Sequence, residues 1–127
     1  MIDTMTNVNA VIDRYIDAWN ESNPAARMAL IDETWTEDAV YIDPLVAASG
    51  REAIAATIGA VQEQFPGFTF RLAGQPDSHH NLARFTWELA ASAEAVPLVV
   101  GFDVAVLSED GRLRAVHGFL DKVPEIS

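Results

Sequence analysis

The period of the hydrophobic pattern changes once along this chain, and that change limits its fold more than any other feature. Before Pro66 and Gly67, apolar residues recur with the three- and four-residue spacing of a helix. From Phe68 onward, apolar and polar residues alternate, which is typical of a strand with one buried face. Helices first and a long antiparallel sheet afterwards predict an α+β fold, with the helices covering one face of a curved sheet.

Three helices are expected before this change. The first has one apolar stripe, formed by Val8, Val11, Ile12, Tyr15, Ile16 and Trp19. Asn23 and Pro24 are residue types of an N-cap and a first helical position, so a second helix should begin there. Its inner face would consist of Met28, Ile31 and Trp35. Ser49 and Glu52 have the spacing of a capping box at the start of the third helix, and a short strand over 39–44 precedes it.

The second half predicts a sheet joined by short turns. The expected strands span residues 68–73, 82–90, 98–107 and 113–121, with a polar loop over 74–81. In 82–90, Phe85, Trp87 and Leu89 share one face.

The last hairpin predicts which side chains share a face of the sheet. A two-residue loop of Asp110 and Gly111 would place Asp103 opposite Gly118. Small and apolar residues share that face, namely Gly101, Ala105, Val116 and Leu120. The other face would carry Phe102, Val104, His117 and Phe119. An acid opposite a glycine leaves room beside the carboxyl group, as a pocket requires.

Composition excludes several classes of function. A chain of 127 residues predicts a single domain over 1–127. The net charge of −11 disfavours binding to nucleic acid or anionic membranes. The absence of cysteine excludes disulfides, a thiolate zinc site and a cysteine nucleophile. Acids near the N-terminus argue against a secretory signal and no apolar run is long enough for a membrane span, so a cytoplasmic location is expected.

Three polar residues lie in apolar settings: Tyr15 on the first helix stripe, Asp43 at a strand end and Asp103 within a strand. Each has an ordinary structural explanation. A core tyrosine packs its ring and hydrogen-bonds its hydroxyl, an aspartate before proline ends a strand in a solvated turn, and Asp103 could face water. Taken together, a tyrosine and two acids indicate acid–base chemistry on a carbonyl compound.

Four segments between residues 8 and 121 carry a resemblance to a known family: RYIDAWN, the strand that ends in DP, GREAI and GFDVAVLSEDGRL. Through these segments the sequence resembles the nuclear transport factor 2-like superfamily, in its SnoaL-like branch. This resemblance implies a cystatin-like cone, in which a strongly bent antiparallel sheet and the N-terminal helices enclose an apolar cavity. The pattern of polar residues is similar to that of ketosteroid isomerase. That similarity implies Asp43 as general base, with Tyr15 and a protonated Asp103 as hydrogen-bond donors to the substrate oxygen.

The residues expected around the substrate are Trp19, Trp35, Tyr41, Trp87, Val116, Gly118 and Leu120. The segment between Tyr15 and Asp43 is longer than in the isomerase, and the three tryptophans fill space, so a smaller or planar aromatic substrate is also compatible. If the register of the last hairpin shifts by one residue, His117 and Asp121 replace the other groups as acid–base residues.

The expected function is a cofactor-independent isomerase or cyclase acting on a small apolar carbonyl compound. The alternatives are a non-catalytic binding or dimerisation module of the same fold, and a dehydratase or epoxide hydrolase. A homodimer through the sheet is expected. No metal site is expected, because the adjacent His79 and His80 would point apart on an extended chain.

Overall fold

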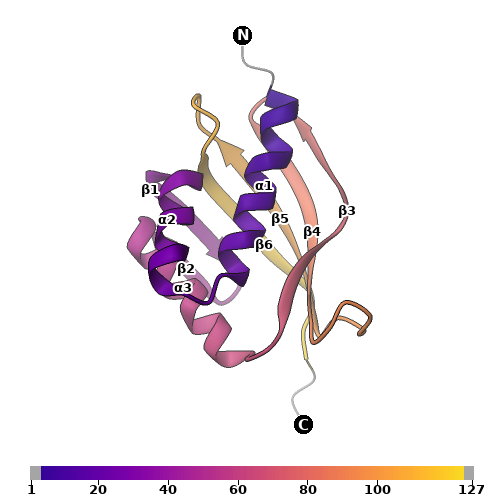
Figure 1. The fold of residues 1–127 in the computed structure, drawn as a ribbon. Helices are drawn as coiled ribbons and strands as arrows, with labels where there is room; N and C mark the ends of the chain where they lie inside the picture. Colours follow the sequence, from indigo (N-terminus) through magenta and orange to yellow (C-terminus); the bar gives the residue numbers. More distant parts are fainter. Residues whose placement is uncertain (1–3, 125–127) are drawn as a thin grey trace.

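The computed structural model describes residues 4–124 and contains three helices and a six-stranded sheet. Residues 1–3 and 125–127 of the predicted domain lie outside the described range. In chain order the elements are α1 (Thr4–Asn20), α2 (Pro24–Thr34), β1 (Trp35–Asp43), β2 (Val46–Ser49), α3 (Arg51–Gln64), β3 (Thr69–His79), β4 (Leu82–Ala90), β5 (Val99–Leu107) and β6 (Leu113–Lys122). Figure 1 shows their arrangement.

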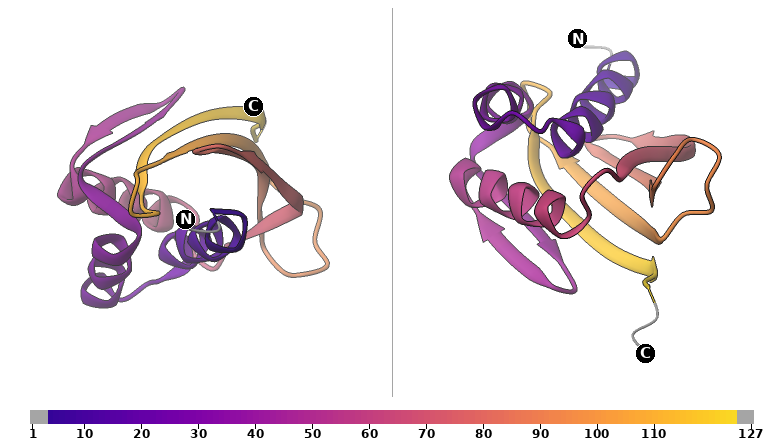
Figure 2. Two further views of the ribbon diagram at one scale, coloured as in Figure 1. Left: turned by 90° about the horizontal axis from the view of Figure 1, so that it is seen from above. Right: turned by 60° about the horizontal axis from the view of Figure 1, so that its bottom comes forward.

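The sheet is strongly curved and its strands follow the order β2-β1-β6-β5-β4-β3. Only the pair of β1 and β6 is parallel among the strands described. Figure 2 shows the sheet curling around α1, while α3 packs against β1 and β2, and α2 contacts both other helices. The predicted α+β arrangement, with helices on one face of a curved sheet, is confirmed.

The second helix begins as predicted but ends earlier. The Asn23 side chain accepts a hydrogen bond from the Ala26 amide at 3.0 Å, which satisfies one of the free amides of the first turn. Trp35, expected on this helix, is instead the first residue of β1 with an extended backbone. The side chain of Trp35 is fully buried, so its predicted core position is confirmed. Its predicted assignment to the helix is wrong.

The third helix has no capping box. Gly50 is its N-cap, with φ of +89°, and no side chain caps the helix. Ser49 belongs to β2, a strand that the sequence analysis missed, and pairs with Val40. The Gly50 amide donates to Ala39 O at 2.7 Å, so the chain leaves the sheet directly into the helix.

The segment 74–79, expected in a polar loop, continues β3. This strand is at the edge of the sheet, where polar side chains can remain in water while the backbone pairs on one side. The pairing register shifts between Ala73 and Asp77, next to Gly74 with φ of +82°. The strand over 82–90 has the predicted bounds.

The turn between β5 and β6 is one residue longer than expected. The Ser108 amide donates to Arg112 O at 2.7 Å, and the Gly111 amide donates to Ser108 O at 3.1 Å. The loop therefore contains Glu109, Asp110 and Gly111, and φ of +80° at Gly111 is the left-handed position that this turn needs.

A bulge restores the predicted register. Leu107 pairs with Leu113, but beyond Arg114 the pairing shifts by one residue, so that Asp103 pairs with Gly118. The expected pair is confirmed, although the two-residue loop from which it was derived is wrong. The longer loop and the bulge compensate for each other.

The two faces of the sheet are those predicted. Burial alternates along β5, with Asp103 on the inner face. His117 and Phe119 lie on the outer face, where 58% of Phe119 is exposed. Within the described part of the chain, none of the helices combines the length and the apolar composition that a membrane crossing requires.

Candidate active site

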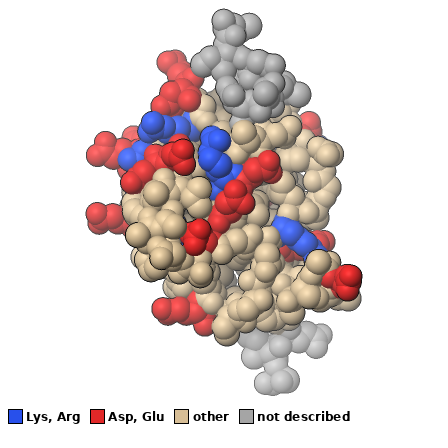
Figure 3. Space-filling model, in the orientation of Figure 1, with Lys and Arg blue, Asp and Glu red and all other residues tan. Residues whose placement is uncertain are grey.

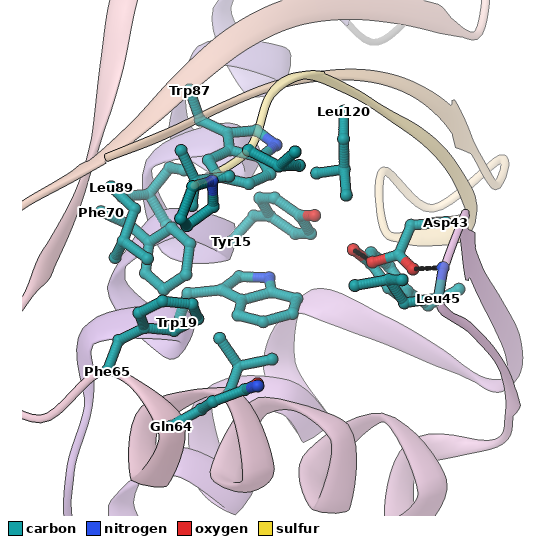
Figure 4. Close-up of a pocket in the computed structure, with 16 residues that line it drawn as sticks. Tyr15, Trp19, Asp43, Leu45, Gln64, Phe65, Phe70, Trp87, Leu89 and Leu120 are labelled. Carbon is teal, nitrogen blue, oxygen red and sulfur yellow. Dashed lines mark hydrogen bonds between the residues drawn. The ribbon is translucent and has the colours of Figure 1, made fainter. Parts of the chain in front are cut away.

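A cavity of about 500 Å³ lies between α1, α3 and the concave face of the sheet. Figure 4 shows its walls, which are mainly aromatic and aliphatic. The lining residues are Tyr15, Ile16, Trp19, Tyr41, Asp43, Leu45, Val61, Gln64, Phe65, Phe70, Trp87, Leu89, Val99, Leu120, Val123 and Pro124. A pocket of this size and polarity suits a small apolar molecule held by a few polar groups.

Tyr15 and Asp103 form a buried pair at one wall. The Tyr15 hydroxyl donates to Asp103 Oδ2 at 2.7 Å, although the residues are 88 positions apart in the chain. The ring of Tyr15 is fixed by contacts with Trp19, Trp35 and Phe85. Its hydroxyl reaches the cavity (Figure 4), whereas Asp103 is only 1% exposed and lies behind it.

The environment of Asp103 favours its protonated form. Burial raises the pKa of Asp103 to about 6, hydrogen bonds from Tyr15 and Trp87 oppose that rise, and the charge of Asp43 adds to it. Asp103 Oδ1 has no hydrogen-bond partner among the described residues. The carboxyl group therefore exchanges a proton closer to neutral pH than an exposed aspartate does.

Gly101 makes room for one of those donors. It is the cross-strand partner of Trp87, and a Cβ atom on Gly101 would lie only 2.0 Å from Trp87 Cζ2 and 2.6 Å from Nε1. The indole thus lies flat across β5 next to Asp103. Any larger residue at position 101 would displace it.

Asp43 is held differently, at the open end of β1. The Tyr41 hydroxyl donates to Asp43 Oδ2 at 2.6 Å, and the amides of Leu45 and Val46 donate to Oδ1 at 2.8 and 3.0 Å. Burial raises the pKa of Tyr41, so its hydroxyl keeps its proton and remains a donor. Asp43 therefore closes a turn and also faces the cavity (Figure 4). A structural role in the turn and a role as general base are thus compatible.

Gly118 separates the two acids. Strand β6 lies between β1 and β5, and a Cβ atom on Gly118 would be 2.8 Å from Asp103 Oδ1 and 3.3 Å from Asp43 Cβ. The space predicted beside Gly118 exists, but the Asp103 carboxyl group occupies it. The missing side chain lets the side chains of both acids approach β6 at the same point.

The predicted binding residues divide into two groups. Trp19, Tyr41, Trp87 and Leu120 line the cavity. Trp35, Val116 and Gly118 do not: Trp35 and Val116 are completely buried in the core, and Gly118 is covered by Asp103. Strand parity identified the face of Val116 and Gly118 correctly, but it does not distinguish residues at the cavity from those packed under helices. Trp35 instead supports Tyr15 from behind, with 5.8 Å between ring centroids.

His117 and Asp121 are exposed on the outer side of β6 and do not reach the cavity, because the predicted register holds at Asp103. His79 and His80 lie at the turn between β3 and β4, with 3.1 Å between their Nδ1 atoms. Over residues 4–124, no group of three or more His, Asp or Glu residues could hold a metal ion.

The sequence analysis missed the hydrogen bond between Tyr41 and Asp43, and several cavity residues from α3 and β3. Two residues apart on a strand, Tyr41 and Asp43 must share a face, so this contact could have been found from parity. The contribution of Gln64, Phe65 and Phe70 depends on how α3 crosses the sheet, for which the sequence carries no local signal.

Comparison with known proteins gives one family and many similar structures. The model of the SnoaL-like domain matches residues 12–116. A "putative isomerase of the SnoaL-like family" from Agrobacterium tumefaciens str. C58 is 40% identical, with a TM-score of 0.85, covering 91% of this chain and 98% of that chain. A search of curated proteins finds no match.

Two more distant structures show the fold alone. A "putative SnoaL-like polyketide cyclase" from Jannaschia sp. CCS1 is 19% identical, with a TM-score of 0.70, covering 91% of this chain and 86% of that chain. A protein with a cystatin-like fold from Methylobium petroleophilum PM1 is 20% identical, with a TM-score of 0.72, covering 96% and 80%. The predicted cystatin-like fold is confirmed, and the chain belongs to the SnoaL-like domain family.

Proposed function

We propose that this protein is a cofactor-independent acid–base enzyme that isomerises or cyclises a small apolar carbonyl compound. One observation carries the proposal: the Tyr15 hydroxyl and the Asp43 carboxylate enter the same apolar cavity, and a second acid, Asp103, is bonded to Tyr15 from behind. A base and a hydrogen-bond donor at the two sides of one cavity can remove a proton next to a carbonyl group.

In the proposed reaction, Asp43 takes a proton from the carbon next to the carbonyl group and returns it to another carbon. Negative charge then develops on the carbonyl oxygen, and a donor aimed at that oxygen stabilises the transition state by several kcal/mol. Tyr15 is that donor. Hydrogen bonds from the Leu45 and Val46 amides keep the Asp43 carboxylate in one position, so less conformational freedom is lost when the reactive geometry forms.

The Tyr15 hydroxyl has a single proton, and in the ligand-free protein it uses this proton to donate a hydrogen bond to Asp103 Oδ2. To donate to a substrate oxygen it must release Asp103, and a protonated Asp103 can then donate to the Tyr15 oxygen. The raised pKa of Asp103, caused mainly by burial, favours that protonation. Asp103 is thus a positioning residue that acts through Tyr15, unlike the direct donor implied by the sequence resemblance.

The test is turnover of a β,γ-unsaturated ketosteroid, followed by the ultraviolet absorbance of the conjugated enone. Wild type should convert it, and Asp43→Asn should lose about 10²- to 10⁴-fold in kcat, the usual contribution of a general base. The asparagine keeps an oxygen for the Leu45 and Val46 amides, so the thermal midpoint should stay close to wild type. Equal turnover by the variant would exclude Asp43 as the base.

A non-catalytic binding module is the second candidate, because all three hydrogen bonds to Asp43 also suit a purely structural turn. It predicts that an enolate mimic such as equilenin binds in the cavity while no carbonyl substrate is converted. Calorimetric titration beside the turnover assay separates the two functions.

The small apolar ligand and the homodimer stay predictions. The outer face of the sheet exposes Ile42 and Phe119 to 41% and 58%, which is compatible with a second copy covering it. Analytical sedimentation of wild type and Phe119→Glu tests the dimer. Wild type should sediment as a dimer and the variant as a monomer, because a glutamate would place a charge in the interface.

A further inference from the structure

A second cavity, of about 600 Å³, lies between the end of α1, the start of α2 and the last turns of α3. It shares some apolar walls with the first cavity, among them Trp19, Phe65 and Phe70. In contrast to the first cavity, a basic side chain, Arg27, lines it. This arginine is only 9% exposed, and neither the sequence analysis nor the proposed reaction gives it a role.

Every hydrogen bond that fixes Arg27 goes to a neutral acceptor. Its Nε donates to Glu21 O at 3.1 Å, and its Nη2 donates to Gln62 Oε1 at 3.0 Å and weakly to Ser22 O at 3.5 Å. Gln62 is oriented for this contact, because its Nε2 donates to the carbonyls of Trp19 and Glu21 at 2.9 Å. The guanidinium group is therefore held rigidly without any carboxylate.

No carboxylate between residues 4 and 124 lies within ion-pair distance of Arg27. Of the nearby acids, Glu63 is exposed at the cavity, and Glu21 Oε2 accepts from the Asn23 amide. Arg27 also lies in the first turn of α2, where the helix dipole is positive. A largely buried cation in this position is stabilised when an anion accompanies it.

One side of the guanidinium group is still available. Nη1 makes no hydrogen bond to a described residue, so two N–H groups in a fixed plane are free for a ligand. Helix α3 passes it at Gly59, where a Cβ atom would be 3.0 Å from Nη1. A glycine inside a helix lowers its stability, and here it provides space around Nη1.

We propose that this second cavity binds the carboxylate of a small apolar acid, with Arg27 Nη1 as the anchor. The aromatic walls take up the apolar body, and the guanidinium group donates to the carboxylate oxygens. A monoanion fits better than a phosphate dianion, because the chain carries a net charge of −11 and acidic side chains surround its helices (Figure 3). The anchor of this site, Arg27, has no part in the proposed reaction, which uses the first cavity.

Calorimetric titration with phenylacetate and with phenylacetamide tests the site. The two probes have the same body, so only the charge differs. We expect phenylacetate to bind about tenfold or more tightly, the usual gain from charge-assisted hydrogen bonds. Arg27→Gln should remove this difference, whereas Arg84→Gln, which changes the net charge equally at an exposed site, should keep it.

Gly59→Ala is the second variant, in case Arg27→Gln does not fold. Alanine favours the helix and its methyl group crowds Nη1, so the fold should persist while phenylacetate binding weakens. Amide chemical shifts locate the probe, and changes at Gly59 and Gly67 are expected. Equal affinity for the two probes, or changes at Val99 and Leu120 of the first cavity in their place, would overturn the proposal.

Discussion

The two carboxyl groups beside Gly118 have the same chemistry and opposite surroundings. Asp103 is enclosed, its pKa is raised to about 6 by burial, and one of its oxygens has no partner among the described residues. Asp43 lies at the open end of the cavity, and three hydrogen bonds satisfy both of its oxygens. The contrast teaches that position in the sheet, and not residue type, determines whether a carboxyl group is enclosed with one oxygen unpaired or is held by donors at the cavity.

Tyr15→Phe should have the largest effect of the substitutions that test this contrast between the two acids. Loss of the hydroxyl removes the donor that lies in the cavity and leaves Asp103 with fewer partners. We expect kcat for the ketosteroid to fall by about 10²- to 10³-fold, as for loss of an oxyanion donor. Because the hydrogen bond from Tyr15 lowers the pKa of Asp103, that pKa should rise further in the variant. Carbon NMR of the carboxyl groups checks it, and an unchanged kcat would contradict the role of Tyr15.

Asp103→Asn should change how stability depends on pH. The pKa of Asp103 is about 6 in the folded protein and 3.8 in an unperturbed carboxyl group, so the folded state binds more protons between these values. Asp103 then costs nothing below pH 4, and its full penalty of about 2 to 3 kcal/mol is present above pH 6. Urea unfolding should show the variant gaining stability over wild type as pH rises from 4 to 7. A constant difference would show that burial does not hold this proton.

Gly118→Ala tests the space between the two acids. Its methyl group would be 2.8 Å from Asp103 Oδ1, so we expect a loss of about 1 to 2 kcal/mol in unfolding free energy. In an Asp103→Ala background the oxygen is absent and the loss should shrink, although the contact with Asp43 Cβ at 3.3 Å remains. Additive losses in this double-mutant cycle would mean that the methyl group is accommodated elsewhere.

Tyr41→Phe should have the smallest effect. Asp43 keeps its two amide donors, so only one hydrogen bond is lost, at a cost of about 0.5 to 1.5 kcal/mol. The pH dependence attributed to Asp103 should be unchanged, which urea unfolding at two pH values can verify. A shift of that dependence would mean that the two acids are coupled more strongly than their separate hydrogen bonds suggest.

The fold could be predicted where one pattern extends over many residues. The helical stripe of α1 and the alternation in β4 and β5 each repeat several times, so a single misread residue does not change them. Trp35 was assigned to the wrong element because one apolar residue fits the end of a helix stripe and the start of a strand equally well. The β2 strand was missed because four residues carry too little periodicity.

For the candidate site, the sequence predicts which side chains share a face of the sheet, but not which side chains of other elements they contact. Parity placed Asp103 on the same face as Gly101, Ala105 and Gly118, since it depends only on the register. The positioning of Asp103 behind Tyr15 depends on helix packing, and so does the burial of Arg27. Such contacts join segments far apart in the chain and leave no local pattern.

The three-residue loop and the bulge of the last hairpin together affect which deletions this tip can tolerate. A loop of three residues and a bulge at Arg114 each shift the pairing by one position, in opposite senses. Deleting one loop residue can be absorbed by loss of the bulge if the loop recruits Arg112 and stays three residues long, with Asp103 still facing Gly118. We expect relatives with one residue fewer between these two positions to lack the bulge, so that such a deletion leaves the chemistry of the interior intact.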